Sequence, residues 1–201
     1  MTTVKAPVSN TQEERPTRKL TLTLGQSAHS VKMHPALIDQ IDEEAFINLI
    51  SAYMDQPFDF TYQQDGLIFN VTLTHTLTLV ARQKELAAID VELSPLFEDD
   101  FEKAFQLLMD WDAFFNGAGL VKLNKSYYVP LGQLKAKFDA VHNEKFGVNT
   151  GGWSKGGSQF SIGMDRFERS IFNLHTKKTV NKPVYKVSIN ISSIGLRDAE
   201  R

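Results

Sequence analysis

The clearest pattern along the chain is an alternation of apolar and polar residues with a period of two. It runs through Lys19–Gly25, through the Leu- and Thr-rich segment 70–81, and through Lys182–Ser192 near the C-terminus. Alternation of this kind is typical of β-strands with one buried face. We therefore predict strands over 19–25, 58–62, 67–82, 120–129, 158–163 and 182–192. Gln63–Gly66 is predicted to form the turn between the second and the third of these.

Apolar residues at a spacing of three or four positions predict helices between these strands. The strongest signal covers residues 94–119, where Ser94 is placed to cap the helix. Weaker signals of the same kind predict further helices over 42–54, 131–141 and 164–174. In the last of these, Asp165 and Arg169 are spaced to form an ion pair one turn apart.

The order of these elements does not alternate strand and helix as a parallel α/β sheet does. We predict an α+β fold in which amphipathic helices pack on a mainly antiparallel sheet. Residues 1–17 are polar and rich in Thr, Pro and Glu, which predicts a flexible N-terminal arm. The remaining residues, 18–201, are predicted to form a single domain.

One segment, TGGWSKGGSQFS at 150–161, combines four glycines with Trp153 and Lys155. We interpret it as a mobile connection between strands. Glycine also lets a loop approach a ligand backbone closely, so a finger that holds a nucleic-acid strand is the alternative. An exposed indole would favour the finger, whereas a buried indole would serve as an anchor in the core.

The composition limits the class of protein. The chain has 201 residues, and its 14 Phe and two Trp can supply a core without a metal or disulfide staple. The absence of Cys excludes disulfide scaffolds, thiol nucleophiles and Cys-based zinc or iron–sulfur sites. No apolar run approaches about 18 residues and the N-terminus lacks a secretory signal, so the sequence predicts a cytoplasmic protein without membrane contact.

A hydrolase motif is present only in outline. Gly152–Gly156 fits the G-x-S-x-G pattern around Ser154, and Asp165 and His175 follow in a hydrolase-like order. Such a nucleophile needs a buried strand before it and a helix after it. The glycine-rich surroundings predict neither, so we expect no enzymatic activity through Ser154.

Phosphate-binding loops and metal sites are no better supported. The chain contains no Gly-Lys-Ser/Thr sequence and no H-E-x-x-H pair. The acidic residues at 98–102, 110 and 112 could hold Mg²⁺, but we interpret them as solvated charges of a helix, where the first few suit its N-terminal dipole. We therefore expect no cofactor and no metal.

Charge is divided unevenly along the chain, although the formal net charge is only −2. Residues 1–112 hold 8 Lys or Arg and 18 Asp or Glu, a net charge of −10, whereas residues 113–201 hold 14 and 6, a net charge of +8. Such asymmetry points to an acidic or polyanionic partner. The alternative is that the two halves fold into one body and neutralise each other across it.

The basic half combines cations with aromatic residues, as a nucleic-acid groove does. Lysines neutralise phosphates and aromatic rings stack on bases. The candidate nucleic-acid-binding residues are Lys122, Lys125, Lys135, Lys137, Trp153, Lys155, Lys177, Lys178, Lys182 and Lys186. We predict a non-enzymatic nucleic-acid-binding accessory protein, with DNA or RNA left open, provided that these side chains converge on one surface.

A protein-interaction or assembly module is the alternative function. In this interpretation the N-terminal arm and the oppositely charged halves contact a protein partner or another copy of the chain, as in a mobile-element, viral or inhibitor protein. The sequence matches no recognised nucleic-acid-binding module, so both interpretations stand.

Overall fold

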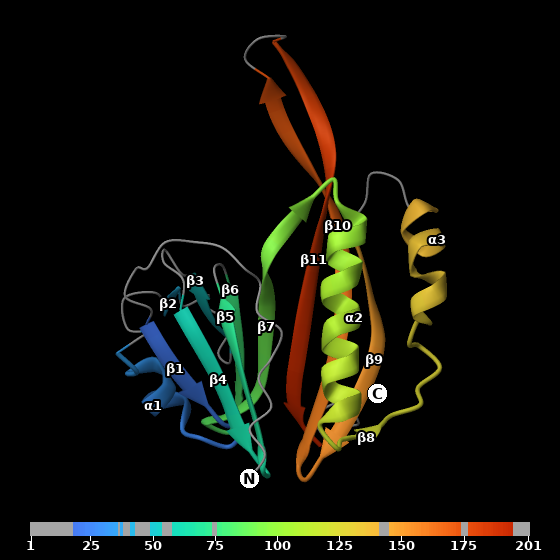
Figure 1. Ribbon diagram of the computed structural model, residues 1–201. Helices are drawn as coiled ribbons and strands as arrows, with labels where there is room; N and C mark the ends of the chain where they lie inside the picture. The colour runs from blue at the N-terminus through green and yellow to red at the C-terminus, as the bar shows by residue number, and fades with distance from the viewer. Residues whose placement is uncertain are drawn as a thin grey trace.

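The computed structural model describes residues 18–35, 37, 41–42, 49–53, 58–73, 76–140, 145–173 and 177–194. In these residues the fold is mostly antiparallel β-sheet with a few helices, which is broadly the predicted α+β class. The predicted N-terminal arm lies outside the described residues. Figure 1 shows a large sheet with a small sheet and the longest helix packed on its front.

The large sheet contains eight described strands, and each neighbouring pair is antiparallel. In spatial order the strands are β2 (Ile41–Asp42), β3 (Leu49–Tyr53), β6 (Thr76–Arg82), β7 (Glu85–Glu98), β11 (Lys178–Ser193), β10 (Ser158–Asn173), β9 (Phe146–Lys155) and β8 (Val121–Lys122). The C-terminal strand β11 thus lies at the centre of the sheet and joins the two halves of the chain.

The small sheet and the helices form the second layer. The small sheet has β1 (Arg18–Leu22) parallel to β4 (Phe58–Gln64) and β4 antiparallel to β5 (Leu67–Leu73). The helical elements are α1 (Ala28–Lys32), α2 (Phe101–Gly117), the 3₁₀ turn η1 (Leu131–Gln133) and α3 (Leu134–Asp139). Helix α2 lies along β10 and β11, beside the small sheet (Figure 1).

Aromatic side chains fill the space between the layers. Phe69 of the small sheet contacts the rings of Trp111 and Phe115 on α2, and Phe115 in turn contacts Trp153 and Phe160 of the large sheet. All five rings are buried, and burying a side chain of this size stabilises the fold by about 1.5–3 kcal/mol. The two sheets and α2 therefore share one hydrophobic core.

Two segments that were predicted as helices form strands. Residues 49–53 form β3, and residues 164–173 continue β10. Apolar residues recur there at three or four positions, but pairing with neighbouring strands decides the backbone conformation. The predicted ion pair between Asp165 and Arg169 is also wrong. Asp165 pairs with Lys186, and Arg169 pairs with Glu98.

The start of the long helix is also corrected. Residues 94–98 belong to β7, so Ser94 does not cap the helix. Helix α2 begins at Phe101, and the Asp100 carboxylate accepts a hydrogen bond of 3.1 Å from the backbone N–H of Lys103. Hydrogen bonds from Lys103 hold the pKa of Asp100 below its ordinary value, as expected for a carboxylate that satisfies a free N–H at a helix start.

The remaining strand predictions are confirmed in outline, with three changes. The predicted strand 67–82 divides into β5 of the small sheet and β6 of the large sheet. The predicted strand 120–129 shortens to the two residues of β8. The glycine-rich segment 150–161 is not a mobile connection, because it consists of the end of β9, a turn at Gly156–Gly157 and the start of β10. Trp153 therefore stands within a strand of the large sheet.

Strands β10 and β11 extend beyond their neighbours as a two-stranded ribbon. The last residue of β10 that pairs with β9 is Arg166, and the last residue of β11 that pairs with β7 is Val184. Six further residue pairs follow, from Glu168–Pro183 to Asn173–Lys178, which corresponds to about 20 Å of strand. We call residues 168–173 and 178–183 the free ribbon, and Figure 1 shows it projecting from the body of the molecule.

Candidate nucleic-acid interface

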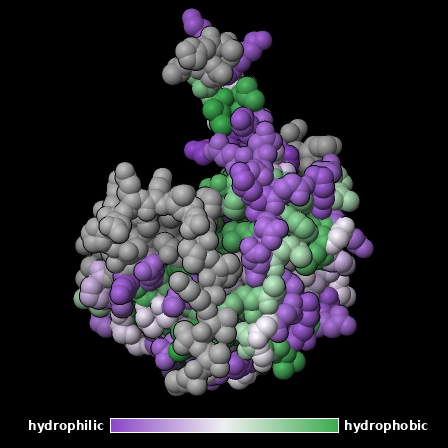
Figure 2. All heavy atoms as spheres, in the orientation of Figure 1, coloured by the Kyte–Doolittle hydropathy of each residue, from purple (hydrophilic) through white to green (hydrophobic). Residues whose placement is uncertain are grey.

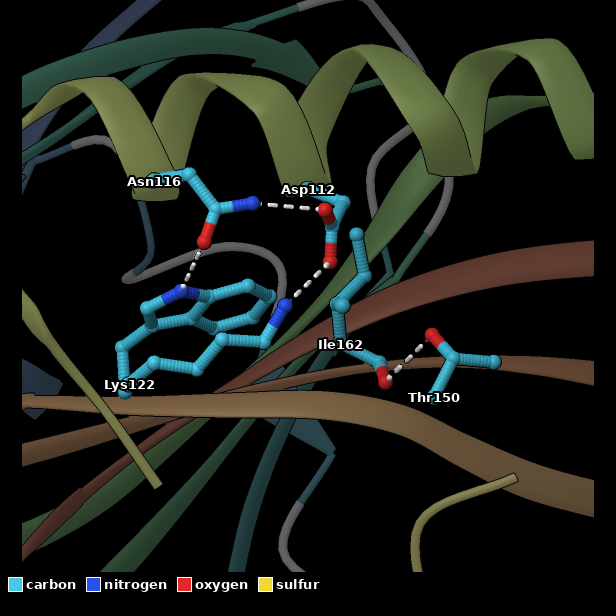
Figure 3. A network of polar contacts seen from close by, with 6 residues as sticks. Asp112, Asn116, Lys122, Thr150 and Ile162 are labelled. Carbon is cyan, nitrogen blue, oxygen red and sulfur yellow. Dashed lines mark hydrogen bonds and ion pairs between the residues drawn. The ribbon is translucent and has the colours of Figure 1, made fainter. Parts of the chain in front are cut away.

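Trp153 is buried and belongs to a polar network with α2. Its indole N–H donates a hydrogen bond of 3.0 Å to Asn116, whose amide in turn donates one of 2.7 Å to Asp112. Lys122 lies over the indole, 5.6 Å from the ring centroid, and its ammonium is 3.8 Å from Asp112 (Figure 3). The indole has no exposed surface, so Trp153 acts as an anchor and has no free face for a nucleic-acid base.

The glycines beside Trp153 serve this packing. A side chain at Gly151 would meet the indole ring within 2.7 Å, and a side chain at Gly152 would meet the Tyr128 hydroxyl within 1.9 Å. Both distances are shorter than van der Waals contact. The close approach that the glycines permit is therefore made to the protein's own rings.

Two lysines of the predicted set besides Lys122 also have carboxylate partners. Lys135 is 3.5 Å from Glu102 and lies over the Phe101 ring at 4.9 Å. Lys186 is 3.4 Å from Asp165 and 3.8 Å from Glu92. The acidic partners Glu92, Glu102 and Asp112 all come from residues 1–112, as does Glu98, which pairs with Arg169 at 2.6 Å. Neutralisation between the acidic and basic halves, the alternative raised from the sequence, therefore accounts for Lys122, Lys135, Arg169 and Lys186.

The surroundings of Lys186 are crowded with negative charge. Asp90, Glu92 and Asp165 share the face of the large sheet that points away from α2. Burial among protein atoms raises the pKa of Asp90 to about 6, and Asp165 and Glu92 raise it further while Lys186 lowers it. Lys186 therefore holds carboxylates in place and is not available as a free cation.

Three other lysines of the predicted set stand on the ribbon without such partners. Lys178 and Lys182 lie on β11, and Lys177 precedes them at the end of the ribbon with a positive φ of 50°. All three are exposed. Among the residues that the structure describes, none of the three forms an ion pair.

The free ribbon also exposes apolar surface. Phe172 is 56% exposed and Val180 is 46% exposed. Figure 2 shows hydrophobic side chains on the projecting part of the molecule with hydrophilic ones beside them. Exposed apolar groups and cations without an ion pair among the described residues therefore lie together on this element.

The remaining predicted cations do not extend this surface into a single patch. Lys155 stands at the β9–β10 turn, and β10 spans 16 residues from that turn to the ribbon end, or about 50 Å. Lys125 is exposed and follows β8, near the same turn. Lys137 is exposed on α3, where the adjacent Phe138 contacts Tyr185 near the start of the ribbon. The predicted residues therefore divide between opposite ends of the sheet and do not converge on one surface, which narrows the candidate surface to the ribbon lysines.

The backbone around Ser154 does not have the strand-turn-helix arrangement of a hydrolase nucleophile. That residue lies in β9 and pairs with Gln159 of β10 across a tight turn, where the hydrolase motif requires a helix. His175 lies outside the described residues. Among the described His, Asp and Glu residues, no group of three is arranged to hold a metal ion.

Sequence reasoning missed the ribbon as a structural element, although it included its lysines. The segment 164–174 was assigned to a helix, which hid the pairing of Ile171 with Val180 and of Phe172 with Thr179. A usable signal was the strong strand pattern of Lys182–Ser192, because a long strand at one end of a chain needs a partner of similar length.

Comparison of the chain with protein-family models, with curated protein sequences and with solved structures returned no match. No helix within the described ranges is long and apolar enough to cross a membrane. The geometry described above is therefore the basis for a functional hypothesis.

Proposed function

We propose that this protein is a non-enzymatic nucleic-acid-binding accessory protein and that the free ribbon is its contact element. The observation that carries the proposal is the contrast among its lysines. Lys177, Lys178 and Lys182 are exposed and unpaired among the described residues, whereas Lys122, Lys135 and Lys186 lie 3.4–3.8 Å from carboxylates. Unpaired cations on a projecting element can each neutralise a phosphate and release a counterion.

Salt dependence gives the sharpest test of this proposal. Three phosphate contacts predict that log Kobs falls with log salt with a slope of about −2.1 to −2.7, so affinity drops about 20–40-fold between about 50 and 200 mM salt. We would measure binding of the full chain to a mixed-sequence oligonucleotide by fluorescence anisotropy. Absence of binding at low salt would refute the proposal.

A matched pair of variants assigns the binding to the ribbon. The first replaces Lys177, Lys178 and Lys182 with Gln, and the second replaces Lys125, Lys137 and Lys155 with Gln. Both remove the same charge from side chains without an ion pair among the described residues. The first variant should lose nearly all of the salt slope, because each phosphate contact contributes about one unit. Equal losses in both variants would show that the binding depends only on net charge.

Protein interaction or assembly is the second candidate function, and the exposed apolar groups of the ribbon favour it. Phe172 and Val180 expose 56% and 46% of their surface, and such groups are enriched in protein contacts. Light scattering over a range of concentrations tests self-assembly. A monomer at all concentrations, together with salt-sensitive oligonucleotide binding, would favour the first function.

A further inference from the structure

We infer that the ligand of the free ribbon is double-stranded DNA and that one face of the ribbon enters the major groove. This inference rests on the proposed function and names its substrate class.

The two faces of the ribbon differ in chemistry. Residues two apart on a strand share a face, and directly paired residues of neighbouring strands lie on the same face. Lys178, Val180 and Lys182 therefore share one face of β11. Ile171 and Arg169 of β10 lie on the same face, beside Val180 and Lys182. We call this set the lysine face. The other face carries uncharged side chains near its outer end, namely Ser170, Phe172, Thr179 and Asn181.

The other face is partly occupied by its own contacts. The Ser170 hydroxyl is 2.8 Å from the Asn181 side-chain oxygen and donates a hydrogen bond to it. On the lysine face, Arg169 is held by Glu98 at 2.6 Å, so Lys178 and Lys182 are its unpaired cations among the described residues. These two lysines are four residues apart along β11, which separates their Cα atoms by about 13 Å.

The shape of the ribbon fits a duplex groove. Its two strands lie about 4.8 Å apart, and the major groove of B-form DNA, about 12 Å wide and 8.5 Å deep, admits a two-stranded ribbon. The ribbon extends about 20 Å past its last neighbouring strand, which gives it enough length to cross the groove. Lys178 and Lys182 can then reach guanine or phosphate oxygens, while Val180 can contact a thymine methyl group.

The same features disfavour single strands and RNA duplexes. Single-strand binding depends on aromatic rings beside a cationic groove, but the lysine face carries no ring and the only described exposed ring on the ribbon, Phe172, lies on the opposite face. The major groove of an A-form RNA duplex is too narrow for side chains to read. The ribbon is therefore suited to B-form DNA.

The acidic residues near the start of the ribbon limit how far it can enter the groove. Glu98 and Asp99 lie at the end of β7, and the backbone N–H of Asp99 donates a hydrogen bond of 2.7 Å to the carbonyl of Pro183. Negative charge at this point repels phosphates. The outer part of the ribbon is thus the region that contacts DNA.

The experiment compares three probes of one sequence with the full chain, namely a short DNA duplex, its single strands and the RNA duplex. The DNA duplex should bind about tenfold or more tightly than either of the others. Methyl green, which occupies the major groove, should displace the protein, and netropsin, which occupies the minor groove, should not.

A matched pair of variants tests the assignment of the face. Lys178→Gln combined with Lys182→Gln should weaken binding to the DNA duplex about tenfold at low salt and reduce the salt slope by about two. Phe172→Ser, on the opposite face, should leave binding unchanged. Reduced binding in Phe172→Ser with unchanged binding in the double variant would overturn the assignment.

The outcomes separate this inference from the proposed function. Equal affinity for duplex and single-stranded DNA, or displacement by netropsin alone, would overturn the inference and leave nucleic-acid binding in place. Failure to bind any of the three probes would overturn both. Concentration-dependent self-association that the double lysine variant abolishes, without DNA binding, would assign the lysine face to a second copy of the chain.

Discussion

Lysines in two regions of this protein have opposite surroundings. Within the body, Lys122 lies over the buried Trp153 ring and near Asp112, and Lys186 lies between Asp165 and Glu92. On the free ribbon, Lys178 and Lys182 are exposed and have no ion pair among the described residues. A basic segment of sequence thus supplies two kinds of cation, those that pair with carboxylates of the fold and those that have no ion pair among the described residues.

The aromatic residues divide in the same way. Trp153 is fully buried and bonded to Asn116, whereas Phe172 is 56% exposed on the ribbon. Burial of a large ring contributes to stability in proportion to the area removed from water. Substitutions in the body should therefore change stability, whereas substitutions of the lysines on the free ribbon should change binding.

The largest effect is expected for Trp153→Ala. Removing a fully buried indole leaves a cavity beside Phe115 and frees Asn116, which should lower the free energy of unfolding by about 3–5 kcal/mol. Chemical denaturation followed by circular dichroism measures this change. Phe172→Ala is the control and should change stability by less than about 0.5 kcal/mol. Similar losses in both variants would erase the contrast between the regions.

Lys186→Gln should have the next largest effect. Lys186 is 21% exposed and faces Asp165 and Glu92 at 3.4 and 3.8 Å, so its loss leaves neighbouring carboxylates without a counter-charge. We expect the free energy of unfolding to fall by about 1–3 kcal/mol, with oligonucleotide affinity unchanged. Lys178→Gln should give the reverse result. A loss of affinity without a loss of stability in Lys186→Gln would place it with the ribbon lysines.

Asn116→Ala should lower stability by about 1–2 kcal/mol, because the buried indole N–H of Trp153 loses its acceptor. The indole emission should also change, since its hydrogen-bond partner is gone. Denaturation and fluorescence spectra measure the two effects. Gln106 provides a matched control, since its side-chain bond to Asp110 is exposed; Gln106→Ala should be nearly neutral.

Asp90→Asn should stabilise the protein slightly above pH 6. The folded pKa of Asp90, about 6, exceeds the ordinary value of 3.8, so the folded state binds the proton more tightly and stability falls as pH rises between about 4 and 6. Neighbouring protein atoms remove only part of the water around this carboxylate, because Asp90 remains exposed at the sheet surface. Solvent therefore limits the gain in the free energy of unfolding to less than about 1 kcal/mol at pH 7. Urea denaturation should show no difference below pH 4, and a constant difference at all pH values would contradict this origin.

The smallest effect on stability is expected for Val180→Ser. Val180 is 46% exposed on the free ribbon, where it pairs with Ile171, so the free energy of unfolding should change by less than about 0.5 kcal/mol. Thermal unfolding provides the measurement. A loss comparable to that of Lys186→Gln would mean that the ribbon is covered by another part of the molecule.

The parts of the fold that were predicted from the sequence are those in which burial imposes a pattern. Strand β11 has Val187, Ile189 and Ile191 on its buried face, and the predicted alternation over 182–192 is confirmed. Helix α2 has Ala104, Leu108 and Trp111 on its buried face, and its periodicity predicted it, although the prediction placed its start at Ser94 instead of Phe101. Each has one face in the core, and only then does the spacing of apolar residues distinguish a strand from a helix.

The outer part of β10 could not be predicted in this way. Both faces of the free ribbon are open to solvent, so no alternation is imposed on residues 168–173, and the chance spacing of Phe167 and Ile171 resembles a helix. The burial of Trp153 was also hidden, because its partner Asn116 lies 37 residues away in the chain. Which of the predicted lysines are free depends on the same long-range contacts.

Strands β10 and β11 run without interruption from the body into the ribbon. The ribbon residues 168–173 and 178–183 contain no glycine, and no break in either strand separates the ribbon from the sheet. A partner bound to the outer end of the ribbon would consequently set the orientation of the whole molecule. The far edge of the sheet, some tens of ångströms away, would then be presented at a fixed angle to whatever lies alongside.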